Sequence, residues 1–367
     1  MMRSFFIKIF CISLLLFFLY PSMGQSMWDV SAHNAILIDK ESGRILYEKN
    51  PHEQTLIASL TKVMTAVIAI EYGDLNDVVS ASNRAIYTSG SSIYLQKNEK
   101  MTLEDLLYGL MLRSGNDASI AIAEHVGGSV EGFVFLMNEK AKYLGLSNTH
   151  FANPHGLDEP KHYSSAYDVA KLMQYAMDNE KFQQVAGAIS YQSDNRSYKW
   201  NNKNKLLSKL YEHCTGGKTG FTKKAGRTLV SSAEKDGLHL IAVTLNASDD
   251  WNDHISMYEW GFEKFEPKKL ISKGSKNFRM YNDNEIEGLI EHDVIFPLQK
   301  EELKKLKKET IIEQADQGKK NIGKIIYKVD SESIVEVPII VTKKESYSFL
   351  DKTWTMLKKI IQVDTDG

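Results

Sequence analysis

The sequence is poor in cysteine, which limits how its fold can be stabilised. Only two of the 367 residues are cysteines, and Cys11 lies inside an apolar segment near the N-terminus. The rest of the chain holds one cysteine, Cys214, so no internal disulfide can form there. The fold must depend on a hydrophobic core, which a chain of this length with 43% apolar residues can supply.

The apolar segment near the N-terminus is too short to cross a membrane. Residues 9–20 make a mostly apolar run of twelve residues, whereas a spanning helix needs about 20. Arg3 and Lys8 precede the segment, and the small residues Ser22 and Gly24 follow it. This order predicts a secretory signal peptide over residues 1–24 and an exported protein, with a retained membrane anchor as the less favoured alternative.

The chain has no excess of basic residues. Its formal net charge of −2 becomes −4 without residues 1–24, which hold two basic residues and no acidic ones. A mildly acidic protein is a poor partner for nucleic acid, whose phosphates require clustered Lys and Arg. The G-x-S-x-G motif of Ser-His-Asp hydrolases is also absent, and the spacing of His150 and His155 matches no common metal motif.

Strand-like runs stand at both ends of a central helical region. Residues 34–39 and 44–49 form one predicted hairpin, and residues 227–233 and 238–247 form another. Between them, apolar residues recur at helical spacing over the ranges 55–72, 102–113, 117–126, 131–144 and 166–179. We expect an α+β domain over residues 25–265, in which one antiparallel sheet is backed by a helical cluster.

The sequence pattern changes after Phe265. Short alternating runs such as KIIYKV and SIVEVPIIV predict a small all-β domain over residues 266–345, in which residues 301–312 fit either a helix or an edge strand. The final segment, residues 346–367, places apolar residues on one helical face and predicts an amphipathic C-terminal helix. Such a helix makes a peripheral membrane contact or docks on its own domain.

A serine and a lysine lie three residues apart in the apolar segment IASLTKVMTAVIAIEY. On a helix Ser59 and Lys62 share one face, so the hydroxyl and the amine can meet. Burial favours the neutral form of a lysine, which can accept the proton of a serine nucleophile. The alternative is that Ser59 caps the helix while Lys62 extends to water. A second SxxK copy, Ser232 to Lys235, falls in a strand and turn, where this geometry is lost.

Two further motifs follow in the chain. Ser114-Gly115-Asn116 falls in a predicted turn between two helices, and Lys218-Thr219-Gly220 begins the second hairpin. Other SxN copies occur at residues 193–195, in a stretch that we expect to be a polar exposed loop, and at residues 275–277, beyond the domain boundary. In this order, SxxK, SxN and KTG are the signature of penicillin-binding proteins and serine β-lactamases.

The chain resembles the low-molecular-mass penicillin-binding proteins, which are the serine-type D-alanyl-D-alanine carboxypeptidases of peptidase family S11. The likeness extends from about residue 27 to the C-terminus and includes ANPHGLD and HYSSAYDVAKL. It is strongest to the branch found in spore-forming Gram-positive bacteria. This implies work on the cell wall or spore cortex, at the outer face of the cytoplasmic membrane, in the wall or in the forespore envelope.

The resemblance implies a reaction and a role for each motif residue. Ser59 would attack the carbonyl between the last two D-alanines of a peptidoglycan stem peptide, and Lys62 would accept its proton. An acyl-enzyme would form and D-alanine would leave. Ser114 and Asn116 would pass the proton to the leaving amine and hold the peptide. β-Lactam antibiotics would be covalent inhibitors, and neither a metal nor an organic cofactor is expected.

The resemblance also implies how the substrate is bound. Lys218 and Thr219 would face its terminal carboxylate, and Lys218 would help to keep the amine of Lys62 neutral. Gly220 would permit close approach of the backbone. The backbone N–H groups of Ser59 and Phe221 would form the oxyanion hole.

One departure from the family concerns the carboxylate. Some members carry an arginine after the last hairpin that helps to bind it, whereas NASDDWNDHIS supplies only aspartates there. Arg227 is a candidate replacement, although we expect it at an exposed strand position. A penicillin sensor without turnover and a β-lactamase remain as alternative functions, and the second domain favours the carboxypeptidase over the β-lactamase.

Overall fold

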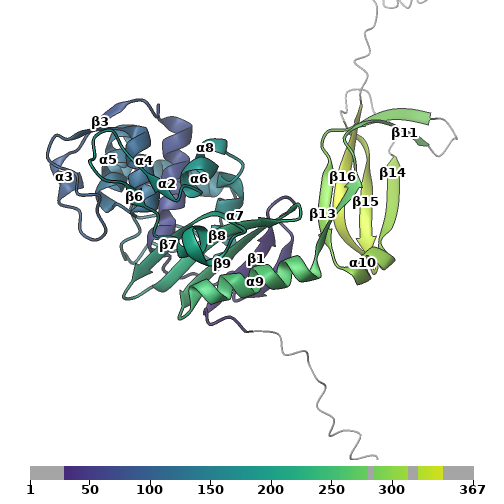
Figure 1. The fold of residues 1–367 in the computed structure, drawn as a ribbon. Coiled ribbons are helices and arrows are strands. Elements are labelled where there is room, and N and C mark those ends of the chain that lie inside the picture. Colours follow the sequence, from purple (N-terminus) through teal and green to yellow (C-terminus); the bar gives the residue numbers. More distant parts are fainter. Residues whose placement is uncertain (1–28, 280–284, 313–320, 342–367) are drawn as a thin grey trace, which may run out of the picture. The chain divides into compact units, whose positions relative to one another are not determined.

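The computed structural model describes residues 29–279, 285–312 and 321–341, which form two compact units (Figure 1). One unit extends to Gly261 and the other begins at Phe262. The predicted signal peptide and the predicted C-terminal helix lie outside the described residues. The predicted domain boundary after residue 265 falls just past the helix that ends at Lys264.

A five-stranded antiparallel sheet forms the base of the first unit. Its strand order is β2 (Ile45–Lys49), β1 (Asn34–Asp39), β9 (Leu238–Ala247), β8 (Gly226–Lys235) and β7 (Cys214–Thr222). Both predicted hairpins are present, because β1 pairs with β2 and β8 pairs with β9. Strand β7 is an edge strand, so one of its sides pairs with no strand in the described part of the chain.

The helices of the central cluster lie between β2 and β7 in the sequence, as predicted. They are η1 (Ala58–Leu60), α2 (Thr61–Tyr72), α3 (Asn83–Ile86), α4 (Leu103–Leu112), α5 (Asn116–Gly127), α6 (Val130–Tyr143), α7 (Ala166–Ala176) and α8 (Glu180–Ala186). Short elements complete the unit: the pairs β3 (Val78–Ser80) with β4 (Lys100–Thr102) and β5 (Ser190–Tyr191) with β6 (Trp200–Asn201), and η2 (Leu206–Leu210). The helix predicted over residues 55–72 starts later than expected, because Ala58 has a φ of +47° and interrupts it.

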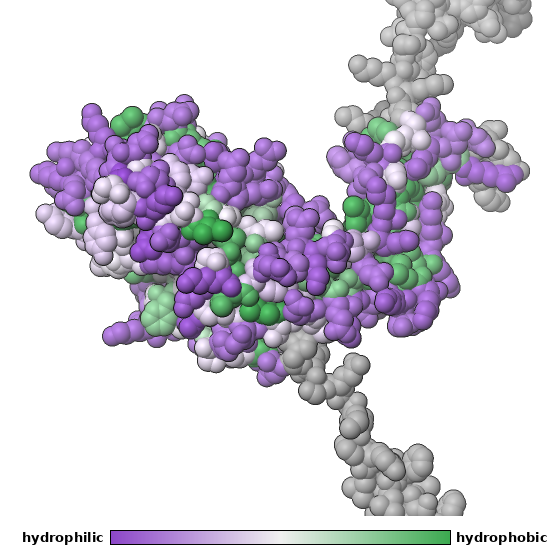
Figure 2. Space-filling model, in the orientation of Figure 1, coloured by the Kyte–Doolittle hydropathy of each residue, from purple (hydrophilic) through white to green (hydrophobic). Residues whose placement is uncertain are grey.

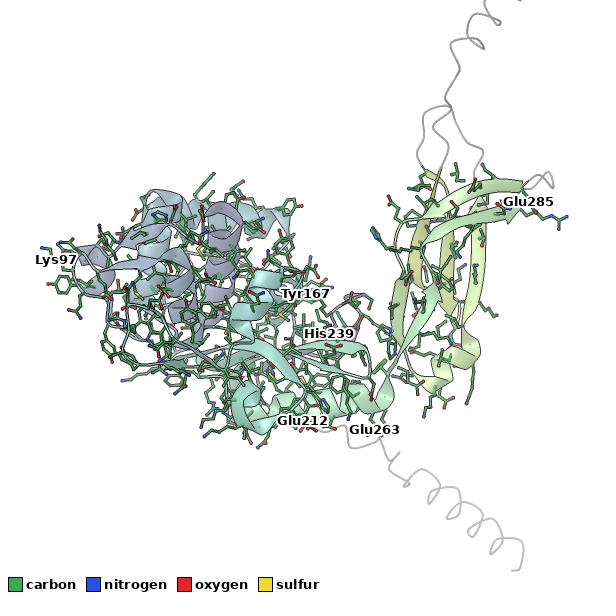
Figure 3. All side chains as sticks on the ribbon, turned by 45° about the horizontal axis from the view of Figure 1, so that its top comes forward. Lys97, Tyr167, Glu212, His239, Glu263 and Glu285 are labelled. Atoms are coloured by element: carbon green, nitrogen blue, oxygen red, sulfur yellow. The ribbon has the colours of Figure 1, made fainter. Side chains whose placement is uncertain are left out.

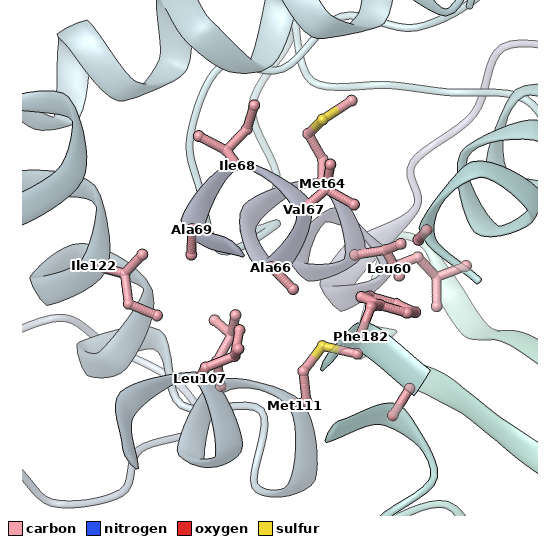
Figure 4. Close-up of a cluster of buried hydrophobic side chains, with 14 of the residues drawn as sticks. Leu60, Met64, Ala66, Val67, Ile68, Ala69, Leu107, Met111, Ile122 and Phe182 are labelled. Atoms are coloured by element: carbon pink, nitrogen blue, oxygen red, sulfur yellow. The ribbon is translucent and has the colours of Figure 1, made fainter. Parts of the chain in front are cut away.

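Helix α2 is the centre of the hydrophobic core. Nine consecutive residues, Thr61 to Ala69, are buried, so the helix has no solvent-exposed face over this length. Its side chains meet Leu107 of α4, Ile122 of α5 and Phe182 of α8 (Figure 4). This enclosure fixes the N-terminal end of α2, where the SxxK motif lies.

The sheet carries helices on both faces (Figure 1). Ile241 and Val243 of β9 belong to the core shared with the helical cluster. Thr244 points to the other face, where its Oγ1 lies 3.1 Å from Nε2 of His254 in α9 (Asp250–Lys264). The Oγ of Ser231 lies 2.7 Å from Nδ1 of the same histidine. Helix α9 was not predicted, because these polar contacts attach it where the sequence shows no simple apolar stripe.

The second unit consists of antiparallel β-strands, as predicted. One sheet has the order β11 (Gly274–Arg279), β12 (Glu285–Ile290), β16 (Glu332–Val341), β15 (Asn321–Val329) and β14 (Lys307–Ile312), and β10 (Glu266–Ile271) pairs with β13 (Val294–Leu298). The ambiguous segment at residues 301–312 forms both alternatives in turn, helix α10 (Lys300–Lys305) and then strand β14.

The face shown in Figure 2 is mostly hydrophilic, with hydrophobic residues in small patches. No single helix within the described ranges is long and apolar enough to cross a bilayer; α5 and α6 reach that size only as a pair bent by 84°.

The buried His254 predicts a pH dependence of stability. Burial lowers the pKa of His254 from 6.5 to about 3, so the unfolded chain binds a proton at this residue between these pH values and the folded chain does not. The contribution of His254 to the free energy of unfolding is therefore fully present above pH 6.5. Acidification below this pH lowers the free energy of unfolding by up to about 1.4 kcal/mol per pH unit through this residue. Urea unfolding of wild type and His254→Gln at pH 7, 6 and 5 measures this. The variant should lose less stability per pH unit, and equal slopes would contradict the prediction.

Candidate active site

Ser59 lies in a tight turn at the entrance to α2. The preceding residue, Ala58, adopts a left-handed backbone conformation, which costs a residue with a side chain about 1–2 kcal/mol. Two hydroxyl groups hold this turn. Thr61 Oγ1 donates to the carbonyl of Ala58 at 2.8 Å, and Thr228 Oγ1 of β8 donates to the carbonyl of Ile57 at 3.1 Å. The turn therefore keeps Ser59 partly exposed beside a buried helix.

The amine of Lys62 makes three polar contacts within a fully buried site. Its Nζ lies 3.0 Å from Ser59 Oγ, 2.7 Å from Asn116 Oδ1 and 2.7 Å from the carbonyl oxygen of His155. A neutral amine has two N–H donors and one lone pair. The amide and carbonyl oxygens can only accept, so they take the two donors. The lone pair is then left for the hydroxyl proton of Ser59.

The surroundings of Lys62 favour this neutral form. Burial holds the pKa of Lys62 well below its usual range, and the positive charges of Lys218 and Lys203 lower it further. Asp117 acts in the opposite direction, as the smallest of these causes. Burial also lowers the pKa of Lys218 to about 7, and Lys203 adds to that effect.

The loop at residues 152–162 forms the wall that holds the carbonyl of His155. Asn153 fixes the loop, because its Oδ1 accepts the N–H groups of His155 and Gly156. His162 is neutral here: Thr61 gives its proton to Ala58, so His162 Nε2–H donates to Thr61 Oγ1 at 2.7 Å, while Nδ1 accepts from the backbone. Burial lowers the pKa of His162 to about 4, in agreement with this tautomer.

The SxN motif begins α5. Ser114 has a φ of +62°, and Asn116 is the first residue of the helix. While Asn116 Oδ1 accepts from Lys62, its Nδ2 donates to the carbonyl of Ser89 at 2.7 Å, so the amide cannot turn over. Asp117, which the sequence analysis did not single out, accepts the backbone N–H groups of Ile93 and Leu95 and so fixes the neighbouring loop.

The KTG motif lies on the edge strand β7, with residues alternating between its two faces. Lys218 is opposite Val230 and faces the helical cluster, and its Nζ donates to the carbonyl of Thr219 at 2.7 Å. Gly220 lies against the Ser59 turn. A Cβ at residue 220 would come within 2.9 Å of Ser59 N and 2.4 Å of Thr228 Oγ1, so only glycine fits this approach.

These three motifs meet at one open cleft of about 430 Å³. Of the predicted site residues, Ser59, Ser114, Thr219, Gly220 and Phe221 line it; Lys62 and Asn116 lie behind Ser59, and Lys218 is buried in β7. The other lining residues are Ser91, Lys203, Arg227, Asp250 and Trp251. The structure thus brings together every residue that the motifs nominated.

Two expectations about residues near the cleft were right in part. Arg227 lies on strand β8 with its side chain 40% exposed, as expected, but it also lines the cleft, next to its cross-strand partner Phe221. The polar stretch around residues 193–203 is mostly exposed, as expected, but not throughout. Ser193 and Trp200 are buried, and Lys203 reaches the cleft, where its Nζ donates to Ser91 Oγ at 3.1 Å. Tertiary contacts decide both cases, and no local sequence pattern marks them.

The second SxxK copy does not form a comparable site. Ser232 lines a separate hollow of about 510 Å³ near His239, the β9 residue marked in Figure 3. Its Oγ contacts Thr215 Oγ1 and the sulfur of Met177, and within the described residues no lysine amine bonds to it. This hydroxyl therefore lacks, in the described part of the chain, the lysine contact that Ser59 has. No group of three His, Cys, Asp or Glu side chains that could hold a metal occurs in the described ranges.

Two family models match the chain, one after the other. The model described as D-alanyl-D-alanine carboxypeptidase matches residues 22–249. The model described as Penicillin-binding protein 5, C-terminal domain, matches residues 265–346. The two matches fall on the sheet-and-helix unit and on the β unit.

Curated proteins and solved structures agree with these matches. The D-alanyl-D-alanine carboxypeptidase DacF of Bacillus subtilis (strain 168) is 34% identical over 355 residues, covering 89% of this chain and 91% of that protein. DacA of Haemophilus influenzae is 32% identical over 337 residues, covering 85% and 84%. The crystal structure of penicillin binding protein 5 from Haemophilus influenzae aligns with a TM-score of 0.77 at 29% identity, covering 87% of this chain and 98% of that one.

The close approach at Gly220 predicts a strong effect of a single methyl group. Gly220→Ala should push β7 away from the Ser59 turn and slow acylation of Ser59 by penicillin about 100-fold or more, since small displacements of reacting groups are costly. Gly216→Ala in the same strand is the matched control, because a Cβ there would come no nearer than 3.2 Å to its neighbours. Intact-protein mass spectrometry gives both rates. Equal rates in the two variants would contradict the predicted role of Gly220.

The cations near Lys62 predict a shift in the pH profile. Protonation of Lys62 removes the base, so acylation should fall as the pH drops through the pKa of Lys62. Lys203→Gln removes a positive charge that lowers this pKa, so the acidic limb of the profile should move to higher pH. Penicillin acylation rates between pH 4 and 9 test this, and a limb that stays in place or moves to lower pH would show that Lys203 does not act on Lys62.

Proposed function

Because this chain belongs to the D-alanyl-D-alanine carboxypeptidase family, we propose that it is a serine-type D-Ala-D-Ala carboxypeptidase in which Ser59 is the nucleophile. Its substrate is a peptidoglycan stem peptide that ends in D-Ala-D-Ala. One observation carries the assignment of the nucleophile: Lys62 Nζ lies 3.0 Å from Ser59 Oγ, and its two N–H donors are directed to Asn116 and His155, so that its lone pair faces Ser59.

Acylation begins when Ser59 Oγ attacks the carbonyl carbon of the penultimate D-alanine. The hydroxyl proton moves to the lone pair of Lys62, and a tetrahedral intermediate forms. The bond to the terminal D-alanine then breaks, and its nitrogen takes up the proton by way of Ser114 Oγ. The products are free D-alanine and an ester between Ser59 and the shortened peptide.

The tetrahedral intermediate carries a negative charge on its oxygen, and hydrogen-bond donors are needed to stabilise this charge. The backbone N–H groups of Ser59 and Phe221 fill this role in the proposal, since Gly220 brings the backbone of β7 against the Ser59 turn. Water then attacks the ester and gives a proton to Lys62, which passes this proton to Ser59 Oγ as the ester bond breaks. The tetrapeptide that leaves can no longer donate its fourth residue for cross-linking by this route.

The same cleft accounts for inhibition by β-lactams. A β-lactam places a strained amide where the substrate places its scissile bond, so Ser59 opens the ring and remains acylated. We propose that the protein acts on the wall side of the cytoplasmic membrane, as its carboxypeptidase relatives in the family suggest. A role in the spore cortex, a forespore location and contact of residues 346–367 with the membrane remain predictions.

The test is release of D-alanine by wild type and by Ser59→Ala. Wild type should release D-alanine from a diacetylated tripeptide ending in D-Ala-D-Ala, and Ser59→Ala should lose about 10⁴-fold or more of this activity. Ser232→Ala, in the second SxxK copy, is the matched control and should keep the activity. Release by Ser59→Ala at the wild-type rate would contradict the assignment of the nucleophile.

Two alternatives predict other results in the same experiment. A penicillin sensor would be acylated by penicillin and release no D-alanine from the peptide. A β-lactamase would hydrolyse penicillin rapidly, so that no acyl-enzyme accumulates. Slow hydrolysis of the penicillin-acylated enzyme, together with release of D-alanine from the peptide, supports the carboxypeptidase function.

A further inference from the structure

The cleft contains two cations at its surface, and each has a different partner. Among the cleft-lining residues, Lys203 and Arg227 are basic and Asp250 is the one acid. Lys203 lies on the side of the helical cluster, where it bonds to Ser91 Oγ. Arg227 lies on strand β8, next to Thr228, whose hydroxyl group holds the Ser59 turn. Either Lys203 or Arg227 could therefore contact an anionic group on the substrate.

Strand register places Arg227 beside the KTG motif. Arg227 is the direct cross-strand partner of Phe221, so their side chains project from the same face of the sheet. Thr219 projects from that face too, as the diagonal neighbour of Arg227, at the roughly 7–8 Å backbone spacing that a long side chain can bridge. The guanidinium and the Thr219 hydroxyl thus serve one end of the cleft, next to the Ser59 turn.

The first residues of α9 hold the guanidinium in position. The side chain of Asp250 is 4% exposed and forms an ion pair with Nη2 of Arg227. The guanidinium also lies over the ring of Trp251, 5.7 Å from its centroid. A buried carboxylate is costly without a partner, so Asp250 keeps Arg227 in this place. The first residues of α9 therefore supply the groups that orient Arg227.

Arg227 still has donors to offer. Its side chain is 40% exposed, and in the described part of the chain its one hydrogen-bond partner is Asp250. A guanidinium has five N–H donors in a planar fork that fits a carboxylate at two oxygens. Lys203 is the weaker candidate, because burial and the charge of Arg113 lower its pKa and a lysine cannot offer that fork.

We infer that Arg227 binds the terminal carboxylate of the substrate together with Thr219, and that Asp250 and Trp251 position its guanidinium. This inference rests on the proposed carboxypeptidase function, which requires a free carboxylate one residue beyond the scissile bond. It makes Arg227 a determinant of specificity for a C-terminal acid over a blocked terminus.

The experiment compares two substrates that differ only at the C-terminus. Diacetyl-L-lysyl-D-alanyl-D-alanine carries the carboxylate, and the same peptide with a C-terminal carboxamide lacks it. Wild type should prefer the acid. Arg227→Gln should lose about 10- to 100-fold in kcat/KM on the acid, as is typical for a lost charged hydrogen bond, and less than about threefold on the amide. The kcat/KM of Arg227→Lys on the acid should lie between the values of wild type and Arg227→Gln.

Three further variants keep the result interpretable. Arg227→Gln with Asp250→Asn removes both charges, so it leaves no unpaired buried carboxylate and should show the same selective loss. Arg84→Gln is the matched control, because Arg84 forms an exposed ion pair with Glu131 outside the cleft-lining set, and it should leave both substrates unaffected. Lys203→Gln tests the competing cation and should retain the preference for the acid.

The outcomes separate this inference from the proposed function. Equal losses on acid and amide, no loss in either Arg227→Gln variant, or loss of the preference in Lys203→Gln alone would overturn the role of Arg227 while wild type still released D-alanine. A wild type that releases no D-alanine from the acid overturns the proposed function and this inference with it.

Discussion

The site depends on one buried lysine amine, which no counter-charge contacts among the residues that the structure describes. Lys62 lies in the core at the start of α2, and its contacts are a hydroxyl, an amide oxygen and a backbone carbonyl. An ammonium ion at this place would be costly, and the nearby positive charges of Lys218 and Lys203 raise that cost. The fold therefore favours a neutral base directed at Ser59, and the remaining features of the site serve to place a carbonyl carbon beside that pair.

Backbone strain is concentrated where the motif residues meet. Ala58 and Ser114 both have left-handed backbone conformations, and each stands at the start of a helix that lines the site. Such residues persist only where the surrounding structure determines them, and at Ala58 the enclosed helix α2 and the hydroxyl groups of Thr61 and Thr228 do so. The core thus stabilises a geometry that the isolated turns would not adopt.

Local patterns and tertiary contacts explain what the sequence could and could not predict. Hairpins and most helices follow from apolar periodicity, and the motif residues follow from the order SxxK, SxN, KTG. The start of α2 was placed too early, because periodicity does not show the left-handed Ala58. Helix α9 was missed because polar contacts of His254 attach it. The carbonyl of His155 and the cleft positions of Lys203 and Arg227 depend on chain segments far apart in sequence, which no local spacing specifies.

The protonation state of Lys62 is the central claim, and it can be measured directly. Protein labelled with ¹³C at the lysine ε-carbons gives one NMR signal per lysine, and Lys62→Met identifies the signal of Lys62. The account predicts that this signal titrates well below the ordinary lysine pKa of 10.5, so that the amine is neutral when most other lysines are charged. A Lys62 signal that titrates near 10.5 would contradict the account, because the proposed base would then be an ammonium ion at neutral pH.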